Sequence, residues 1–226
     1  MAPSALDAFE HEATRLASVL TSTAADGAGA PAGLDQPSTC PPWTVRELAC
    51  HVRIAIARVP RMLTEPPPPG PPIPARAYYT AERFTGADRV AAARLDAASW
   101  PSERALAGAF ADAVRATVAA ARRHDPTRSV RTRWGDAMTL ADYLTTRVVE
   151  VTVHGLDIAA SLRRPPWTSP DAADHVAALL TGNGAGLAAF GWPPVTLIAK
   201  ATGRAPLTDA EAAAVAGTGI TWPVLS

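Results

Sequence analysis

Residues Thr139 to Leu162 read TLADYLTTRVVEVTVHGLDIAASL, and their pattern gives the clearest indication of the fold. On a helical wheel it carries two apolar arcs instead of one. The first arc consists of Val148, Val151, Ile158 and Leu162, and the second of Val149, Val153, Leu156 and Ala160. Between the arcs, one stripe of the helix carries Tyr143, Arg147, Glu150, His154 and Asp157. A helix with two apolar faces is typical of the interior of a helical bundle.

The polar stripe has two interpretations. Either it is a narrow solvent-facing strip on a mostly buried helix, or it faces the bundle interior and binds a metal ion. Glu150 and His154 lie one helical turn apart, so they can bind the same ion. A third ligand would come from another helix, and His51 is the best candidate. Two histidines and one carboxylate suit a catalytic zinc, which keeps a position open for water or substrate. Periodicity does not decide between the two interpretations.

The rest of the chain is also predicted to be helical. Capping signals and proline or glycine boundaries place four long helices at Pro3–Ala25, Thr44–Thr64, Ser99–His124 and Thr139–Leu162. A shorter helical turn is expected near Ala87–Ala97, and short helices at Ser169–Leu180, Val195–Thr202 and Asp209–Val215. Strand-type alternation is scarce. We therefore predict an all-α protein: an antiparallel four-helix bundle over residues 1–164 and a small, mostly helical C-terminal extension over residues 165–226.

Composition excludes several classes of function. The chain has 226 residues, and 21 basic residues balance 21 acidic ones, so it lacks the positive surplus of a nucleic-acid-binding protein. No signal peptide or membrane helix is expected, which indicates a cytoplasmic protein. Twenty of the 21 basic residues are arginine, a bias typical of GC-rich genomes. The proline-rich segment 66–74 is interpreted as a stiff loop, with a polyproline recognition segment as the alternative.

The two cysteines offer little chemistry. Cys50 shares an arc of its helix with arginines, which would acidify its thiol, but it points away from His51. Cys40 precedes two prolines and has no obvious partner. We therefore expect no nucleophile from the protein itself.

Two segments carry a family resemblance. PWTVREL (Pro42–Leu48), followed by His51, and WGDAMTL (Trp134–Leu140), which leads into the polar stripe, resemble the mycothiol-dependent maleylpyruvate isomerase family. This family belongs to the DinB-like metal-binding four-helix bundles. The resemblance covers about residues 3–162 and is weaker after Trp167.

The resemblance implies a metal site and a thiol cosubstrate. A divalent metal, usually zinc, would be bound by His51, Glu150 and His154, with Arg147 and Asp157 supporting these ligands. Mycothiol, a low-molecular-weight thiol of certain high-GC bacteria, would supply the reactive sulfur.

A further group of residues is expected to contact thiol or substrate. It consists of Trp134, Tyr143 and Arg204, the last because Gly203-Arg204 is similar to a basic element near the end of family members.

The leading functional hypothesis is a metal-dependent S-transferase, in which mycothiol is activated as a zinc-bound thiolate and attacks an electrophilic small molecule. One alternative is a mycothiol-dependent cis–trans isomerase of the maleylpyruvate type, and another is a metal-assisted hydrolase. A non-catalytic ligand-binding bundle is the alternative from a different class. The protein is expected to be a monomer or a homodimer.

Overall fold

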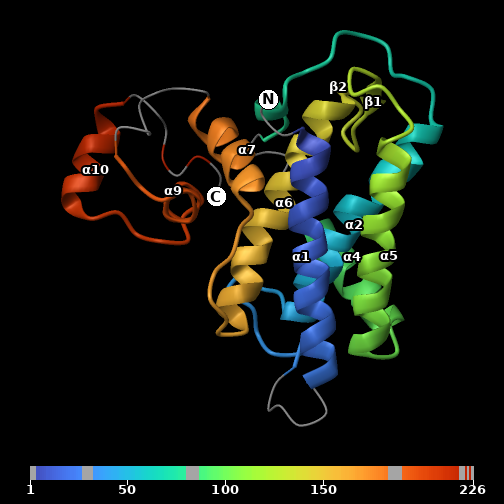
Figure 1. Ribbon diagram of the computed structural model, residues 1–226, viewed down its shortest axis with the longest axis horizontal. Helices are drawn as coiled ribbons and strands as arrows, with labels where there is room; N and C mark the ends of the chain where they lie inside the picture. Colours follow the sequence, from blue (N-terminus) through green and yellow to red (C-terminus); the bar gives the residue numbers. More distant parts are fainter. Residues whose placement is uncertain are drawn as a thin grey trace.

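Four long helices form the body of the protein (Figure 1). The computed structural model describes residues 4–26, 33–79, 87–182, 190–218, 222 and 224. Within them, the bundle consists of α1 (Ala5–Asp26), α2 (Val45–Thr64), α5 (Glu103–Ala121) and α6 (Leu140–Ser161). α1 and α2 each pack against both α5 and α6. The predicted all-α class is confirmed, and the four long helices lie where the sequence places them, to within a few residues at each end.

The helices do not simply alternate in direction. α1 and α6 run the same way, and α2 and α5 both run the opposite way (Figure 1). The connection from α2 to α5 therefore returns along the whole bundle. It contains a short 3₁₀ helix, η1 (Ala75–Tyr78), and the helix α4 (Ala87–Ser99), which packs on α2. The sequence predicts only a helical turn in place of the 13-residue α4.

Side-chain caps explain where these helices begin. Thr44 caps α2, and its hydroxyl and the Glu47 carboxylate form a capping box. Thr139 caps α6 in a similar way, with its hydroxyl accepting a hydrogen bond from the Asp142 amide. α5 begins after its cap Ser102, four residues later than Ser99, the predicted start.

Pro60 lies inside α2 without ending the helix. Proline has no amide hydrogen, so the carbonyl of Ile56, one turn earlier, loses its usual partner. The buried hydroxyl of Thr117 on α5 donates to this carbonyl at 2.9 Å. A side chain from the neighbouring helix thus satisfies the group that the proline leaves unpaired.

The sequence did not predict a small hairpin between α5 and α6. Its strands β1 (Ser129–Arg131) and β2 (Ala137–Thr139) are antiparallel and have three residues each, too few for an alternation signal. Gly135 has a φ of 93° in the connecting turn, a conformation that favours glycine. The hairpin holds the turn residues 132–136 above one end of the bundle (Figure 1).

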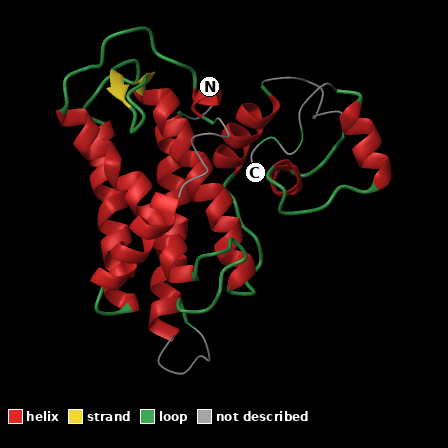
Figure 2. Ribbon diagram, turned by 180° about the vertical axis from the view of Figure 1, so that it is seen from behind, coloured by secondary structure: helices red, strands yellow, loops and turns green. Residues whose placement is uncertain are grey.

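The C-terminal part is helical, as predicted. It contains α7 (Pro170–Thr181), α9 (Pro194–Ala201) and α10 (Asp209–Ala216). α7 packs on α1 and α6, and α9 packs on α7 (Figure 2). The sequence between α7 and α9 is rich in glycine, and residues 183–189 of it lie outside the described residues. Among the described helices, none combines the length and the apolar character required to cross a bilayer.

Candidate metal centre and cavity

The polar stripe of α6 faces the interior of the protein. Tyr143 is fully buried, and Arg147 and Asp157 are each 3% exposed. The side chains of Glu150 and His154 retain 12% and 14% of their exposure. The interpretation of the stripe as a solvent-facing strip is therefore wrong. The stripe is buried because α2 and the loop before it cover this side of α6. Helical periodicity alone does not reveal which elements cover a face.

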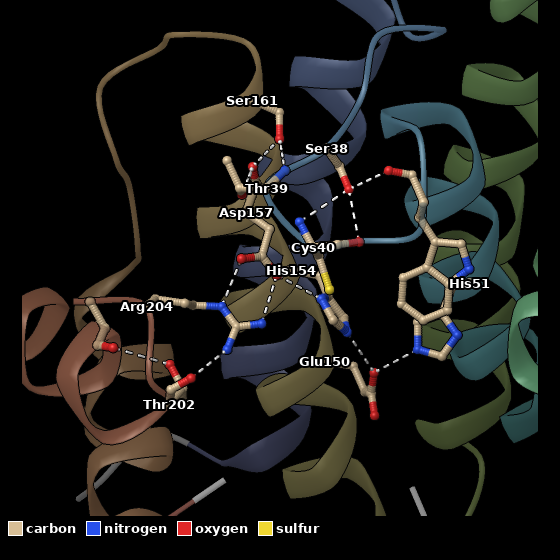
Figure 3. A network of polar contacts seen from close by, with 12 residues as sticks. Ser38, Thr39, Cys40, His51, Glu150, His154, Asp157, Ser161, Thr202 and Arg204 are labelled. Carbon is tan, nitrogen blue, oxygen red and sulfur yellow. Dashed lines mark hydrogen bonds and ion pairs between the residues drawn. The ribbon is translucent and has the colours of Figure 1, made fainter. Parts of the chain in front are cut away.

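Three potential metal ligands converge between α2 and α6 (Figure 3). His51 Nε2 lies 3.5 Å from Glu150 Oε2, and His154 Nε2 lies 3.6 Å from the same oxygen. One ligand atom from each residue lies within 4.8 Å of the other two. Nitrogen and carboxylate oxygen ligands at these separations can surround one ion of the zinc type.

The hydrogen bonds around the three side chains fit a bound cation. His51 Nε2 is buried and makes no hydrogen bond to any described residue, as expected of an atom whose partner is a metal ion. His154 Nδ1 lies 2.9 Å from Asp157 Oδ2, which leaves its Nε2 directed toward Glu150. A histidine that binds metal through one nitrogen commonly donates from the other to a carboxylate.

Trp43 holds the two imidazole rings in place, a role that the sequence analysis did not assign. Its indole stacks on His51 with ring centroids 4.7 Å apart and packs edge-on against His154 at 6.4 Å. Trp43 directly precedes the cap of α2 and is 7% exposed. Its place in the segment PWTVREL was the available signal, but a position before a helix does not show which way a ring points.

The pKa values of the three candidate ligands are shifted in different directions. Burial lowers the pKa of His51, although Glu150 opposes this effect, so His51 is neutral and able to bind metal at neutral pH. Burial also acts against a charged His154, but Asp157, Cys40 and Glu150 raise its pKa to about 9. Burial disfavours ionised Glu150, yet contact with His51 and the charge of Arg147 lower its pKa below the ordinary value. A metal ion that bound here would have to displace a proton from His154.

Arg147 is a buried cation beside this site. Its Nη1 donates to the carbonyl of Ala55 at 3.2 Å, and its Nη2 lies 4.0 Å from Glu150 Oε1. The guanidinium also lies over the rings of Tyr143 and Tyr78, at 4.7 and 5.7 Å from their centroids. Arg147 thus balances the carboxylate charge and is held by π-systems on its other side.

A cavity of about 480 Å³ opens beside the candidate ligands. His51 and Glu150 lie in its wall, together with Tyr143, and its other sides come from α2, α4, η1 and the hairpin turn. Trp134 lies in the turn at the edge of the cavity, 39% exposed and stacked under the guanidinium of Arg133. Two of the three candidate ligands, His51 and Glu150, are therefore accessible to a small molecule.

Arginines dominate the wall of this cavity. Among the described residues, six arginines line it against a single carboxylate, Glu150: Arg53, Arg58, Arg61, Arg89, Arg133 and Arg147. Asp96 on α4 pairs with Arg53, so part of this charge is balanced within the protein. The Nε atom of Arg58 is buried and has no hydrogen-bond acceptor among the described residues. The lining keeps a positive surplus, which favours a negatively charged ligand.

The sequence analysis missed the arginine lining, although one signal was available. Arg58 lies seven residues after His51 and therefore on the same face of α2. Arg89 and Arg133 come from α4 and the hairpin turn, and their arrival at the same cavity depends on the path of the chain.

The residues expected to contact thiol or substrate fall in two places. Trp134 and Tyr143 lie in the cavity wall. Arg204 lies in the turn after α9, where its Nε and Nη2 each donate to Asp157 at 2.7 Å. The described contacts of Arg204 thus lead to the far side of His154, away from the residues that line the cavity (Figure 3).

The structure places the two cysteines in different surroundings. Cys50 is fully buried, and burial, followed by the neighbouring Asp96, raises the pKa of its thiol, so the arginines on its arc do not acidify it. Two arginines on its arc, Arg46 and Arg53, pair with Asp35 and Asp96. Cys40 does have partners, since its sulfur lies within 4.8 Å of ligand atoms of His154 and Asp157.

Comparisons with known proteins point in one direction. A family model described as the mycothiol maleylpyruvate isomerase N-terminal domain matches residues 9–159. Two solved structures of mycothiol-dependent maleylpyruvate isomerase are similar to the chain, each with a TM-score of 0.46. Each alignment covers 76% of this chain and 69% of the isomerase chain. The identities are 19% for the first and 18% for the second, a mutant with a histidine replaced by alanine. No curated protein matches the chain.

Proposed function

Because this chain belongs to the family of mycothiol maleylpyruvate isomerase N-terminal domains, we propose that it is a metal-dependent enzyme that adds the sulfur of mycothiol to an anionic electrophile. The observation that carries this proposal is the convergence of His51, Glu150 and His154 at one side of an arginine-lined cavity. The nucleophile comes from the cosubstrate, because Cys50 is buried and Cys40 is absent from the residues that line the cavity.

The three converging side chains would hold zinc or another divalent metal. A bound zinc ion would lower the pKa of a thiol and keep its sulfur ionised at neutral pH. His51 contributes a neutral nitrogen from a ring fixed by Trp43. Glu150 contributes a carboxylate whose charge Arg147 stabilises before any ligand arrives. Asp157 fixes the orientation of His154.

The arginines of the cavity would select and hold the electrophile. A carboxylate bound by the guanidinium of Arg58 would supply the acceptor that its buried Nε lacks among the described residues. The neighbouring Arg61 and Arg133 extend the positive surface toward the opening. An anionic substrate held there would place its conjugated carbon toward His51 and Glu150, where the thiol sulfur would lie.

The reaction would form one carbon–sulfur bond and then diverge. Addition of the sulfur to an activated double bond moves an electron pair onto the adjacent carbonyl, and the single bond that results can rotate. Loss of the sulfur then restores the double bond in the other geometry and returns mycothiol, which is isomerisation. If the carbon next to the carbonyl instead takes up a proton, the sulfur stays bound as a thioether, and the reaction is S-transfer. The family description supports the isomerase outcome.

Metal analysis is the first test of this proposal. The purified protein is expected to contain about one zinc per chain, and His51→Ala is expected to lose it. His11→Ala is a matched control, because His11 pairs with Asp171 at 3.1 Å on the surface and its side chain is 60% exposed. A protein that binds no divalent metal would contradict the metal-dependent mechanism.

Product analysis separates the reaction types. The metal-loaded protein is incubated with mycothiol and a series of cis-configured conjugated dicarboxylates, and products are identified by mass spectrometry and NMR. A trans product with mycothiol recovered supports the isomerase, whereas a stable thioether supports the S-transferase. Turnover without any thiol would instead indicate hydrolysis, and no turnover with metal bound would indicate a binding protein.

The anionic class of substrate has its own test. Arg58→Gln is expected to raise KM about 10- to 100-fold for a carboxylate substrate, the worth of one charge-assisted hydrogen bond. Arg115→Gln is the matched control, because Arg115 forms an exposed pair with Asp112 on α5. Methyl esters of the same substrates should bind equally well to the wild type and Arg58→Gln. An unchanged KM for the carboxylate would refute the assigned role of Arg58.

A further inference from the structure

Arg204 forms a bidentate ion pair with Asp157, whose carboxylate contacts the candidate metal ligand His154. Arg204 Nε donates to Asp157 Oδ1 and its Nη2 to Asp157 Oδ2, both at 2.7 Å (Figure 3). The remaining nitrogen, Nη1, donates to the carbonyl of Thr202 at 3.0 Å, within the turn that carries Arg204. The guanidinium is thus held by its own loop and presents a two-pronged fork to Asp157, the strongest geometry for an arginine–carboxylate pair.

Asp157, held in this way, orients the ring of His154. Its side chain is 3% exposed, and its Oδ2 lies 2.9 Å from His154 Nδ1. The backbone carbonyl of Asp157 also accepts hydrogen bonds from Ser161 and Thr39, at 2.6 and 3.1 Å. Both ends of the residue are therefore fixed. With Nδ1 bonded to Asp157, the ring of His154 presents Nε2 to Glu150 and His51.

This chain of contacts joins two parts of the sequence. Asp157 and His154 lie in α6, within the segment matched by the family model, whereas Arg204 follows α9, well beyond the match to residues 9–159. α9 packs on α7 and touches α6, which brings the turn at Arg204 alongside the last turns of α6. A buried carboxylate requires a positive partner or several donors. Among the described residues, the donors to the Asp157 carboxylate are Arg204 and His154.

We propose that Arg204 is a positioning residue of the metal centre: its fork holds the Asp157 carboxylate in the one place from which it orients His154. The C-terminal extension thereby determines metal affinity without supplying a ligand. This role replaces the thiol contact that the sequence suggests for Arg204. The inference rests on the proposed metal site, but it concerns the geometry of the ligand and not the reaction.

Zinc affinity provides the test. The dissociation constant of the whole chain is measured by competition with a chromophoric chelator, for the wild type, Arg204→Gln, Arg204→Lys, Asp157→Asn and the double variant. Loss of a group that orients a ligand typically weakens metal binding about 10- to 100-fold, which is the effect expected of Arg204→Gln. Arg204→Lys keeps the charge without the fork and should recover only part of this loss.

The double variant shows whether Arg204 acts through Asp157. If it does, adding Arg204→Gln to Asp157→Asn should change the zinc dissociation constant by less than about threefold. Lys200→Met is the matched control, because Lys200 lies in the same extension and pairs with Glu211 at 2.7 Å without touching Asp157. It should leave zinc affinity unchanged, and circular dichroism should show that every variant is folded.

Two results would overturn the inference. Wild-type affinity in Arg204→Gln would show that the fork does not orient the ligand. Independent, multiplying losses in the double variant would show that Arg204 acts by another route. These results are distinguishable from a failure of the proposed function. Zinc binding that depends on Arg204, in a protein that turns over no electrophile with mycothiol, would refute the function and leave the inference standing.

Discussion

Replacing Arg147 by methionine tests whether the charges of the site are balanced inside the protein. Methionine preserves most of the side-chain volume but removes the cation that faces Glu150. Arg147 Nη2 lies 4.0 Å from Glu150 Oε1, and both side chains are largely buried. At this distance an effective dielectric constant of about 20 gives an attraction of about 4 kcal/mol. Removing one member of a buried ion pair typically costs about 3–5 kcal/mol of stability, in agreement with this attraction.

Urea unfolding of the metal-free protein measures this cost. At pH 7, Arg147→Met is expected to lower the free energy of unfolding by about 4 kcal/mol. A double-mutant cycle with Glu150→Gln isolates the charge interaction from the lost hydrogen bond to Ala55. The coupling free energy should be about 3 kcal/mol or more, and Arg147→Lys should lose less than Arg147→Met.

The pH dependence gives a second arm with a definite sign. Since Glu150 has a lowered pKa in the folded protein, its contribution to stability is present above the ordinary carboxyl pKa and is lost as the pH falls. Removal of Arg147 weakens this lowering, so the cost of Arg147→Met should shrink as the pH falls below about 4.5. A coupling free energy below about 0.5 kcal/mol, together with a cost that does not change with pH, would refute the argument that Arg147 balances Glu150.

Three further predictions concern the helices and the thiols. Thr117→Val should lower the free energy of unfolding by about 1–3 kcal/mol, because it leaves a buried carbonyl of α2 unpaired. Thr127→Val, on the surface, is the control. Equal unfolding curves for Thr117→Val and the wild type would contradict this account. Burial raises the pKa of Glu12, so the stability from its protonated form is lost as the pH rises through that pKa. In urea titrations, the free energy of unfolding of Glu12→Gln should therefore increase relative to that of the wild type between pH 5 and pH 8. A difference in this free energy that does not change with pH would count against a buried charge. Maleimide labelling with mass spectrometry should modify Cys40 in the folded protein and Cys50 only after unfolding; early labelling of Cys50 would show that its burial is wrong.

Helix positions were predictable because their signals are local. Thr44 and Glu47 form a capping box within four residues of chain, and a proline or glycine near a helix end acts over a similar distance. The same holds for Glu150 and His154, since a separation of four residues in a helix places two side chains on one face. The hairpin was missed for the opposite reason, because three-residue strands carry no period.

Local sequence signals were enough to predict the helices, the stripe on α6 and the placement of Glu150 and His154 on one face. Three other features depend on packing between distant segments: this stripe faces inward, Trp43 stacks on His51, and Arg204 holds Asp157. The physical reason is that helical periodicity sets angles between side chains on one helix and carries no information about what covers that face. Asp157 and Arg204 are 47 residues apart, and they meet only because the chain folds back over α6.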